Sequence, residues 1–241
     1  MRVLFPSYLP ESLKKKLQNI NIATVEIPLI KTVPIDFKTD IDFSKFDFII
    51  FSSKNGVKHF FLKISPSTIK NCKIIAVGKS TAKKLKEFGI EAEIPDKFSG
   101  EGLIYYFSDK NIQNKKFLTV RPKVAREIFK EFIQEKGASA EEIIVYETVT
   151  NTEEREKLLR AFSKPIDIIV FTSPSTFKSF LNLSGETGKT SLKKCKIIPI
   201  GDVTAKAIIN SGFNIWKIPT EFTLSGIVDT IIENTNNLEE T

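Results

Sequence analysis

Hydroxyl-bearing residues and glycines recur in two sets, in the same order, and they are the residues best suited to bind a ligand. The first set is Ser52, Ser53, Gly78, Lys79 and Thr81, and the second is Thr172, Ser173, Gly201 and Thr204. Hydroxyls and backbone N–H groups bind carboxylates as neutral hydrogen-bond donors. Apart from Lys79, neither set holds a strong acid, a strong base or a metal ligand. The predicted chemistry is therefore anion binding, although helix capping explains any single serine or threonine equally well.

The elements that must carry these residues follow from the pattern of apolar side chains. Short apolar runs at 48–51 and 168–171 each end in a serine or threonine pair, and an amphipathic helix pattern follows. A second run ends in Gly78 or Gly201, and a second helix is expected to end near Gly89 or Gly212. A third short strand and a final helix are expected after the second helix of each half. This alternation predicts parallel sheets with helices on both faces, and ligands bind at the carboxyl ends of such strands.

The chain is an internal duplication. Residues 72–89 recur as 195–212, and a fainter match relates residues 1–33 to 115–149. Two of these blocks combined give about five strands, the size of a flavodoxin-like domain. The chain thus consists of four successive blocks, of which the first matches the third and the second matches the fourth. Domains formed from neighbouring blocks need one linker, whereas domains formed by crossed pairing, the first block with the fourth and the second with the third, need two. The extended segments 27–34 and 144–149 favour crossed pairing, but periodicity does not decide between the two arrangements.

Composition narrows the classes of protein. The chain has 241 residues, 41% of them hydrophobic, with a net charge of +7, which suits two packed domains and an anionic partner. Its lysines are dispersed, and no aromatic–arginine pattern of an RNA-binding module is present, so no nucleic-acid partner is expected. No apolar run is long enough to cross a membrane, and no signal peptide is recognisable at the N-terminus. We therefore expect a soluble cytoplasmic protein with no membrane partner.

The remaining reactive side chains are few. Cys72 and Cys195 are predicted to be small buried hydrophobes at strand starts, not a disulfide or nucleophiles. His59, in the middle of a predicted helix, is expected to be exposed or half-buried and not catalytic. One histidine and two cysteines are too few for an ordinary zinc site. Residues 185–190 end like a P-loop but have the wrong glycine spacing. No metal or cofactor is expected.

The motifs together resemble the uroporphyrinogen-III synthase family. The segments that carry this resemblance, which extends over nearly the whole chain, are 78–82, 145–149, 171–175 and 200–205. It implies an α/β fold of two flavodoxin-like parallel-sheet domains joined by a two-stranded linker. One domain is discontinuous, formed by residues 1–33 and 150–241, and residues 34–149 form the inserted domain.

The resemblance also implies the reaction. A hydro-lyase of porphyrin and heme biosynthesis would cyclise hydroxymethylbilane in the cleft between its domains, with loss of water and inversion of the fourth pyrrole ring. Tyr146 matches the family's candidate proton donor. The positions implied to bind substrate are Ser52, Ser53, Gly78, Lys79, Thr81, Thr172, Ser173, Gly201 and Thr204. We expect a monomer whose partners are this small molecule and, transiently, the preceding enzyme of the pathway.

Three features depart from the family, one of which is Lys54-Asn55-Gly56 after Ser53, where a small residue and proline or alanine often occur. Phe5-Pro6-Ser7 stands where many members have an Arg-Pro pair, and Asp202 places a negative charge beside Gly201. The alternative is a two-lobed binding module that holds a small anion without catalysis. Tyr146 and the duplicated Gly-x-x-Thr-Ala pattern favour the enzyme.

Overall fold

The computed structural model describes residues 1–70, 72–97, 99–125 and 128–236, which belong to two compact units. Unit 1 comprises Met1–Lys31 and Val149–Thr241, and unit 2 comprises Thr32–Thr148. Two strands, β3 (Ile30–Pro34) and β7 (Ser139–Thr150), cross the boundary between the units and are neighbours in one sheet. The domain limits predicted after residues 33 and 149 fall within these same strands.

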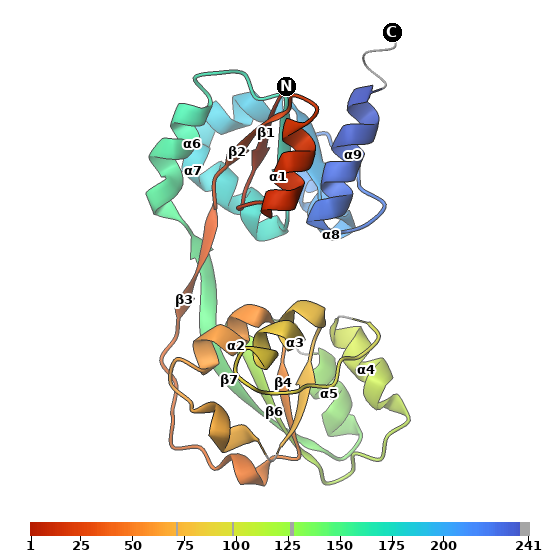
Figure 1. The fold of residues 1–241 in the computed structure, drawn as a ribbon. Helices are drawn as coiled ribbons and strands as arrows, with labels where there is room; N and C mark the ends of the chain where they lie inside the picture. Colours follow the sequence, from red (N-terminus) through yellow and green to blue (C-terminus); the bar gives the residue numbers. More distant parts are fainter. Residues whose placement is uncertain (71, 98, 126–127, 237–241) are drawn as a thin grey trace. The chain divides into compact units, whose positions relative to one another are not determined.

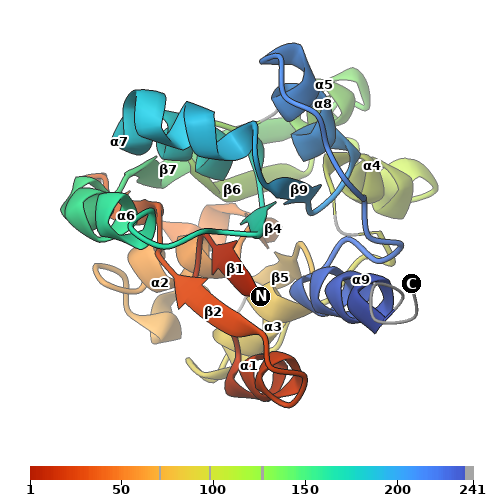
Figure 2. The same ribbon diagram turned by 90° about the horizontal axis from the view of Figure 1, so that it is seen from above.

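Unit 1 is built on a four-stranded parallel sheet of order β2-β1-β8-β9. Its strands are β1 (Arg2–Phe5), β2 (Ala23–Glu26), β8 (Ile168–Phe171) and β9 (Lys196–Pro199). Helices α6 (Arg155–Ala161), α7 (Pro174–Leu192) and α8 (Asp202–Asn210) cover one face. The other face is covered by α1 (Glu11–Gln18) and α9 (Leu224–Asn236), as Figures 1 and 2 show.

The strands of unit 1 are apolar on both faces because each face is covered by helices. Ile169 and Phe171 of β8 pack with α7, whereas Ile168 and Val170 point to the opposite side and pack with α9. Successive strand residues alternate between faces, so an uninterrupted apolar run indicates a strand buried on both sides. The run at 168–171 was predicted on this basis, and its side chains are fully buried.

Unit 2 repeats this plan around a five-stranded sheet of order β3-β7-β6-β4-β5. The three further strands are β4 (Phe48–Phe51), β5 (Lys73–Ala76) and β6 (Lys116–Pro122). Helices α2 (Lys54–Phe60) and α3 (Lys79–Lys86) pack on one face. Helices α4 (Gly100–Ser108) and α5 (Ile128–Glu135) pack on the other (Figure 1).

Strand pairing decides between the two arrangements that the sequence left open. β1 pairs in parallel with β8, and β4 pairs in parallel with β6, so the first block joins the fourth and the second joins the third. Crossed pairing, as the family resemblance implied, is therefore confirmed.

The prediction of a third strand in each half, in the segment between Gly89 and Pro95 or between Gly212 and Pro219, is wrong. In unit 2 the segment makes only a single bridge, Ile75 to Glu93. In unit 1 it forms no strand, and the Trp216 N–H donates to the Ile197 carbonyl at 2.8 Å. Both segments lie beside the last strand of their sheet and soon reach a proline, Pro95 or Pro219. Proline has no N–H to extend a ladder, so the pairing stops after one contact.

The duplicated glycines act as predicted at helix ends. Gly89 and Gly212 adopt left-handed φ values of 72° and 81° after α3 and α8. Such values favour glycine because it has no Cβ. The two cysteines are free and partly buried, and burial raises the pKa of the Cys195 thiol to about 12. Among the described residues, no helix has the length and apolar character to cross a bilayer.

Candidate functional site

The predicted loops of unit 2 lie side by side at the carboxyl ends of adjacent strands. Ser52 and Ser53 follow β4, and Gly78 follows β5, with Phe51 paired to Ala76 at the last rung. The Val77 N–H donates to the Phe51 carbonyl at 3.0 Å and holds the two loops together. The register of parallel strands therefore brings residues from two separate sequence motifs to one edge.

Unit 1 holds the same arrangement. Thr172 and Ser173 follow β8, and Gly201 lies just beyond β9, with Phe171 paired to Pro199. The equivalent backbone bond runs from the Ile200 N–H to the Phe171 carbonyl at 2.8 Å. Each unit thus gathers its own predicted set of hydroxyls and glycines.

The two serines at these ends are helix N-caps. Ser53 Oγ accepts the Gly56 N–H at 3.0 Å. Ser173 Oγ accepts the Thr176 N–H at 3.1 Å, and Thr176 Oγ1 accepts the Ser173 N–H at 3.1 Å in return. This reciprocal pair is a capping box. The structural role predicted for these serines is confirmed, and substrate binding by them stays a prediction.

Gly78 and Gly201 are the N-cap residues of α3 and α8, and the first N–H groups of each helix have no acceptor within the helix. The first in-helix bonds run from Thr81 N–H to the Gly78 carbonyl and from Thr204 N–H to the Gly201 carbonyl, both at 3.1 Å. The N–H groups before each threonine therefore face outward from the first turn, where the helix dipole favours anions. Gly78 has a left-handed φ of 104°, which a residue with a side chain rarely adopts.

The two threonines themselves are almost fully buried. Thr81 is 1% exposed and Thr204 is 3% exposed, and Thr81 Oγ1 donates to the Val77 carbonyl at 3.3 Å. The exposed residues of these first turns are their neighbours, including Lys79 in unit 2 and Asp202 in unit 1. Carboxylate binding by the two hydroxyls stays a prediction, and the backbone N–H groups are the better exposed donors.

Tyr146 lies next to a second predicted site residue. Its hydroxyl is 2.9 Å from Ser53 Oγ, although the two residues are far apart in sequence. The Tyr146 side chain is 5% exposed and packs against the core beneath α2. The Tyr146 hydroxyl is thus held by a serine at the end of β4. Its role as the proton donor stays a prediction.

His59 also contacts Tyr146, and the prediction that its side chain is exposed or half-buried is wrong. The imidazole is 5% exposed, because its ring stacks on Tyr146 with centroids 5.3 Å apart and ring planes 21° apart. Its Nε2 lies 2.9 Å from Thr32 Oγ1 on β3. Burial lowers the pKa of His59, and the positive charge of Lys58 lowers it further. Sequence reasoning missed this contact because no local pattern places β3 and β7 beside α2.

A basic groove flanks the loops of unit 2. It has a volume of about 390 Å³ and is lined by Lys54 and Lys58 of α2, by Lys83 and Lys84 of α3, and by Glu87 at the C-terminal end of α3, among others. Only Lys84 of these lysines pairs with the glutamate in the groove, at 2.7 Å. The positive charge beside the predicted site suits an anionic ligand.

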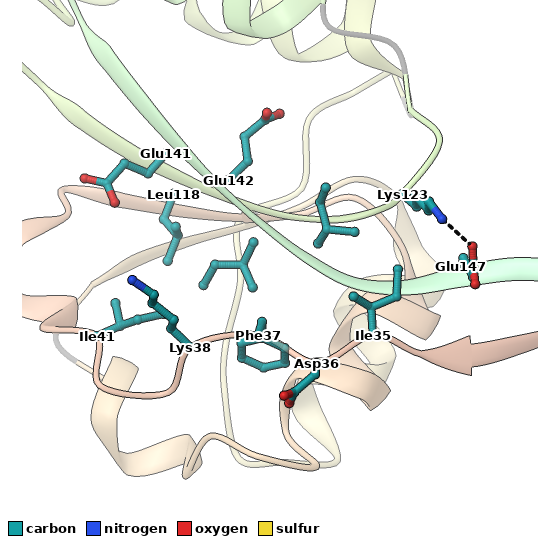
Figure 3. A pocket seen from close by; sticks show the side chains of 12 residues that line it. Ile35, Asp36, Phe37, Lys38, Ile41, Leu118, Lys123, Glu141, Glu142 and Glu147 are labelled. Carbon is teal, nitrogen blue, oxygen red and sulfur yellow. Dashed lines mark hydrogen bonds and ion pairs between the residues drawn. The ribbon is translucent and has the colours of Figure 1, made fainter.

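A larger pocket beside β7 does not suit such a ligand (Figure 3). Its volume is about 620 Å³, and apolar side chains such as Phe37 and Leu118 line it. Four carboxylates, including Glu141 and Glu147, outnumber the two lysines, and Lys123 is paired with Glu147 at 3.0 Å. None of the predicted site residues lines this pocket, and its charge disfavours a polycarboxylate.

A third cavity, of about 340 Å³, includes Ser52 and a partly buried ion-pair network. Arg121 donates to both carboxylate oxygens of Glu142, at 2.7 and 3.1 Å, and Lys130 donates to the same group at 3.2 Å. Burial alone raises the pKa of Glu142, but the bonds from Arg121 and Lys130 outweigh it and lower the pKa overall. Sequence reasoning missed this network, since its residues come from β6, β7 and α5.

The network predicts a pH-dependent effect of Glu142→Gln. The free energy of unfolding of the variant should be about 2 kcal/mol lower than that of the wild type at pH 7, because the nearly buried Arg121 loses its two-pronged bond to this half-buried carboxylate. The lowered folded-state pKa stabilises the protein above the unfolded-state pKa, and this contribution is lost as pH falls through the folded-state pKa. The difference in free energy of unfolding between the variant and the wild type, measured by urea denaturation, should therefore disappear in acid. The exposed neighbour Glu141→Gln is the control, and a difference that stays constant with pH would contradict the assignment.

Comparison with known proteins identifies what the chain is similar to. The family model "Uroporphyrinogen-III synthase HemD" matches residues 11–229. A uroporphyrinogen-III synthase of Chlorobaculum parvum is 31% identical over 218 residues, which cover 86% of this chain and 87% of the relative. A putative uroporphyrinogen-III synthase of Methanocaldococcus jannaschii is 27% identical over 226 residues, covering 90% of this chain and 89% of the relative.

Two solved structures share the fold. The uroporphyrinogen-III synthetase of Helicobacter pylori aligns with a TM-score of 0.68 at 22% identity, covering 96% of this chain and 98% of that one. A mutant uroporphyrinogen III synthase of Thermus thermophilus aligns with a TM-score of 0.63 at 14% identity and covers all of both chains. At these identities the likeness is one of fold.

Proposed function

This chain belongs to the uroporphyrinogen-III synthase family, and on that basis we propose that it is a hydro-lyase that closes hydroxymethylbilane into uroporphyrinogen III. The C–O bond of the hydroxymethyl group on the first pyrrole ring breaks, and the oxygen leaves as water. The fourth ring attacks the resulting azafulvene through its already substituted carbon. The spiro intermediate then breaks at the bond between the fourth ring and the carbon that joined it to the third ring, and the fourth ring inverts. Its free α carbon bonds to that bridging carbon and loses a proton, which balances the proton taken up by the leaving hydroxyl group.

One observation carries the proposal: the predicted proton donor and a predicted substrate-binding serine are in contact. Tyr146 Oη and Ser53 Oγ are 2.9 Å apart at the edge of the sheet where parallel strands end. A departing hydroxyl group needs one proton, and a positioned side chain that supplies it speeds such a step by about 10²–10⁴-fold. Tyr146 supplies that proton, and Ser53 fixes the direction of the phenolic O–H.

The rest of the chain's contribution is to hold the substrate in one shape. Hydroxymethylbilane carries eight carboxylates, and the first-turn N–H groups of α3 and α8 are neutral donors suited to them. The net charge of +7 and the groove lined by Lys54 and Lys58 attract the polyanion. Because the linear substrate also cyclises without help, to the isomer in which the fourth ring is not inverted, positioning must select the product.

Substrate consumption tests whether the protein is an enzyme or only binds. With catalytic amounts of protein, hydroxymethylbilane should disappear several-fold faster than in buffer, with one water lost per product by mass spectrometry. A binding module that lacks catalysis would slow or not change the disappearance, and that result would rule out the proposed activity. Denatured protein is the control.

Thr204→Val is expected to weaken substrate binding while leaving the fold intact. Valine fills the same space as threonine at this buried position, and only the hydroxyl is lost. The KM for hydroxymethylbilane should rise about tenfold, the value of one hydrogen bond to a charged group. Thr230→Val, which changes another buried threonine of unit 1, is the control and should leave KM unchanged. An unaltered KM for Thr204→Val would limit Thr204 to packing within α8.

A further inference from the structure

His59 is a buried polar residue whose presence core packing does not explain. Its side chain is 5% exposed, and one ring nitrogen, Nδ1, is buried with no hydrogen-bond partner. The other nitrogen, Nε2, is bonded to Thr32, so either tautomer leaves a ring nitrogen unsatisfied. A buried polar atom without a partner costs about 1–3 kcal/mol.

The contacts of the imidazole point to one neighbour. Its ring is stacked on the phenol of Tyr146, with centroids 5.3 Å apart and planes 21° apart. The Thr32 hydroxyl holds the edge of the imidazole from β3 at 2.9 Å. Ser53, itself fixed by the Gly56 N–H as the cap of α2, holds the phenolic oxygen. The Tyr146 ring is therefore fixed on its face and at its hydroxyl by two residues that belong to one helix and its cap.

We propose that His59 is a positioning residue for Tyr146 that holds the phenol ring in the orientation needed to protonate the leaving hydroxyl group. This inference rests on the proposed function. Stacking limits rotation of the phenol ring about the axis that runs from Cβ to the hydroxyl oxygen. The hydrogen bond to Ser53 alone leaves that rotation free. Because burial lowers the pKa of His59, the imidazole is neutral near pH 7 and adds no charge beside the donor. His59 acts through Tyr146 and does not touch the substrate.

Three variants test this role by steady-state kinetics with hydroxymethylbilane. His59→Ala removes the stacked ring and should lower kcat about tenfold with KM unchanged, since misplacement of a catalytic group by a fraction of an ångström slows turnover. His59→Phe keeps a flat ring on Tyr146 and should retain kcat within about twofold of the wild type. Thr32→Val frees the edge of the imidazole and should lower kcat by a smaller factor than His59→Ala.

A double variant separates positioning from a general effect on folding. In the Tyr146→Phe background, His59→Ala should cause no further loss of kcat, because the group that it positions is already absent. An equal loss in both backgrounds would overturn the proposal, as would a wild-type kcat for His59→Ala or a loss in His59→Phe as large as in His59→Ala. If His59→Ala does not fold, Thr32→Val and His59→Phe decide by the same comparison. Wild-type protein that does not speed substrate loss would instead contradict the proposed function itself.

Discussion

Tyr146→Phe should lower kcat for hydroxymethylbilane about 10²-fold while KM and the unfolding temperature stay near the wild-type values. The variant loses only the phenolic oxygen, which lies 2.9 Å from Ser53 Oγ. The ring keeps its stacking on His59 and its place in the core beneath α2. A loss of this size is the lower end of what general-acid catalysis by one side chain contributes.

The stability of the variant should change little because Ser53 keeps its other partner. Ser53 Oγ still accepts the Gly56 N–H at 3.0 Å, so the cap of α2 remains. Removal of one neutral hydrogen bond lowers the free energy of unfolding by about 1 kcal/mol. The predicted fall in kcat corresponds to a larger change in activation free energy. A fall in kcat with an intact fold therefore identifies a chemical role and not a packing role.

Tyr105→Phe is the matched control. This tyrosine lies on α4 of the same unit, is 63% exposed, and should tolerate loss of its hydroxyl without any change in kcat. Equal kcat values for Tyr146→Phe and the wild type would remove Tyr146 from the mechanism, and the proton would then have to come from another group.

The second large effect is structural: Gly102→Ala and Gly226→Ala should each destabilise the protein. These glycines lie at equivalent places in the duplication, at the starts of α4 and α9. Each N–H is accepted by a capping hydroxyl, Gly102 by Ser99 at 3.1 Å and Gly226 by Thr223 at 3.0 Å. A Cβ at Gly102 would overlap the Lys97 carbonyl oxygen, and one at Gly226 would overlap the Glu221 carbonyl oxygen.

The size of the loss follows from two opposed terms. Alanine is favoured over glycine in a helix by about 1 kcal/mol. The new methyl group, however, forces a backbone carbonyl to move, and overpacking of this kind costs about 1–3 kcal/mol or more. Because the overlap with the carbonyl oxygen is severe, we take the upper end of this range, about 3 kcal/mol. Subtraction of the helix preference leaves a net loss of about 2 kcal/mol, which lowers the unfolding temperature by about 4–8 °C in a chain of this length.

Gly56→Ala is the matched control for both glycine variants. Gly56 also lies in the first turn of a helix, α2, but a Cβ there would meet its nearest atoms at 3.4 and 3.6 Å, which is ordinary contact. Calorimetry should therefore show an unfolding temperature equal to or above that of the wild type for Gly56→Ala. A similar change in all three variants would show that close backbone approach is not the reason for the duplicated glycines.

The sequence predicts most of the architecture because the relevant signals are local. Uninterrupted apolar runs such as residues 168–171 indicate strands covered on both faces, and they are buried. Gly89 and Gly212 follow the helix patterns and adopt the left-handed conformation that ends a helix. The duplication explains why these signals occur twice. The extra strand predicted in each half failed where proline limits the ladder, so a short apolar segment alone overstates sheet pairing.

The candidate site was predictable only in part. The strand ends carry their serines, threonines and glycines as expected, since parallel register alone brings adjacent loops together. The contact between Tyr146 and Ser53 depends on how β7 lies relative to β4, which no local pattern records. The burial of His59 likewise depends on Thr32 of β3 and on the ring of Tyr146. Long-range packing of this kind decides which polar residues share an environment.

The isomer composition of the product shows directly whether the protein selects the macrocycle with an inverted fourth ring. Hydroxymethylbilane is incubated with catalytic amounts of the protein, and the cyclic products are separated by chromatography against authentic type I and type III isomers. We expect nearly all of the product to be uroporphyrinogen III, in which the fourth ring is inverted. A product that consists only of the type I isomer, as forms in buffer, would contradict this expectation.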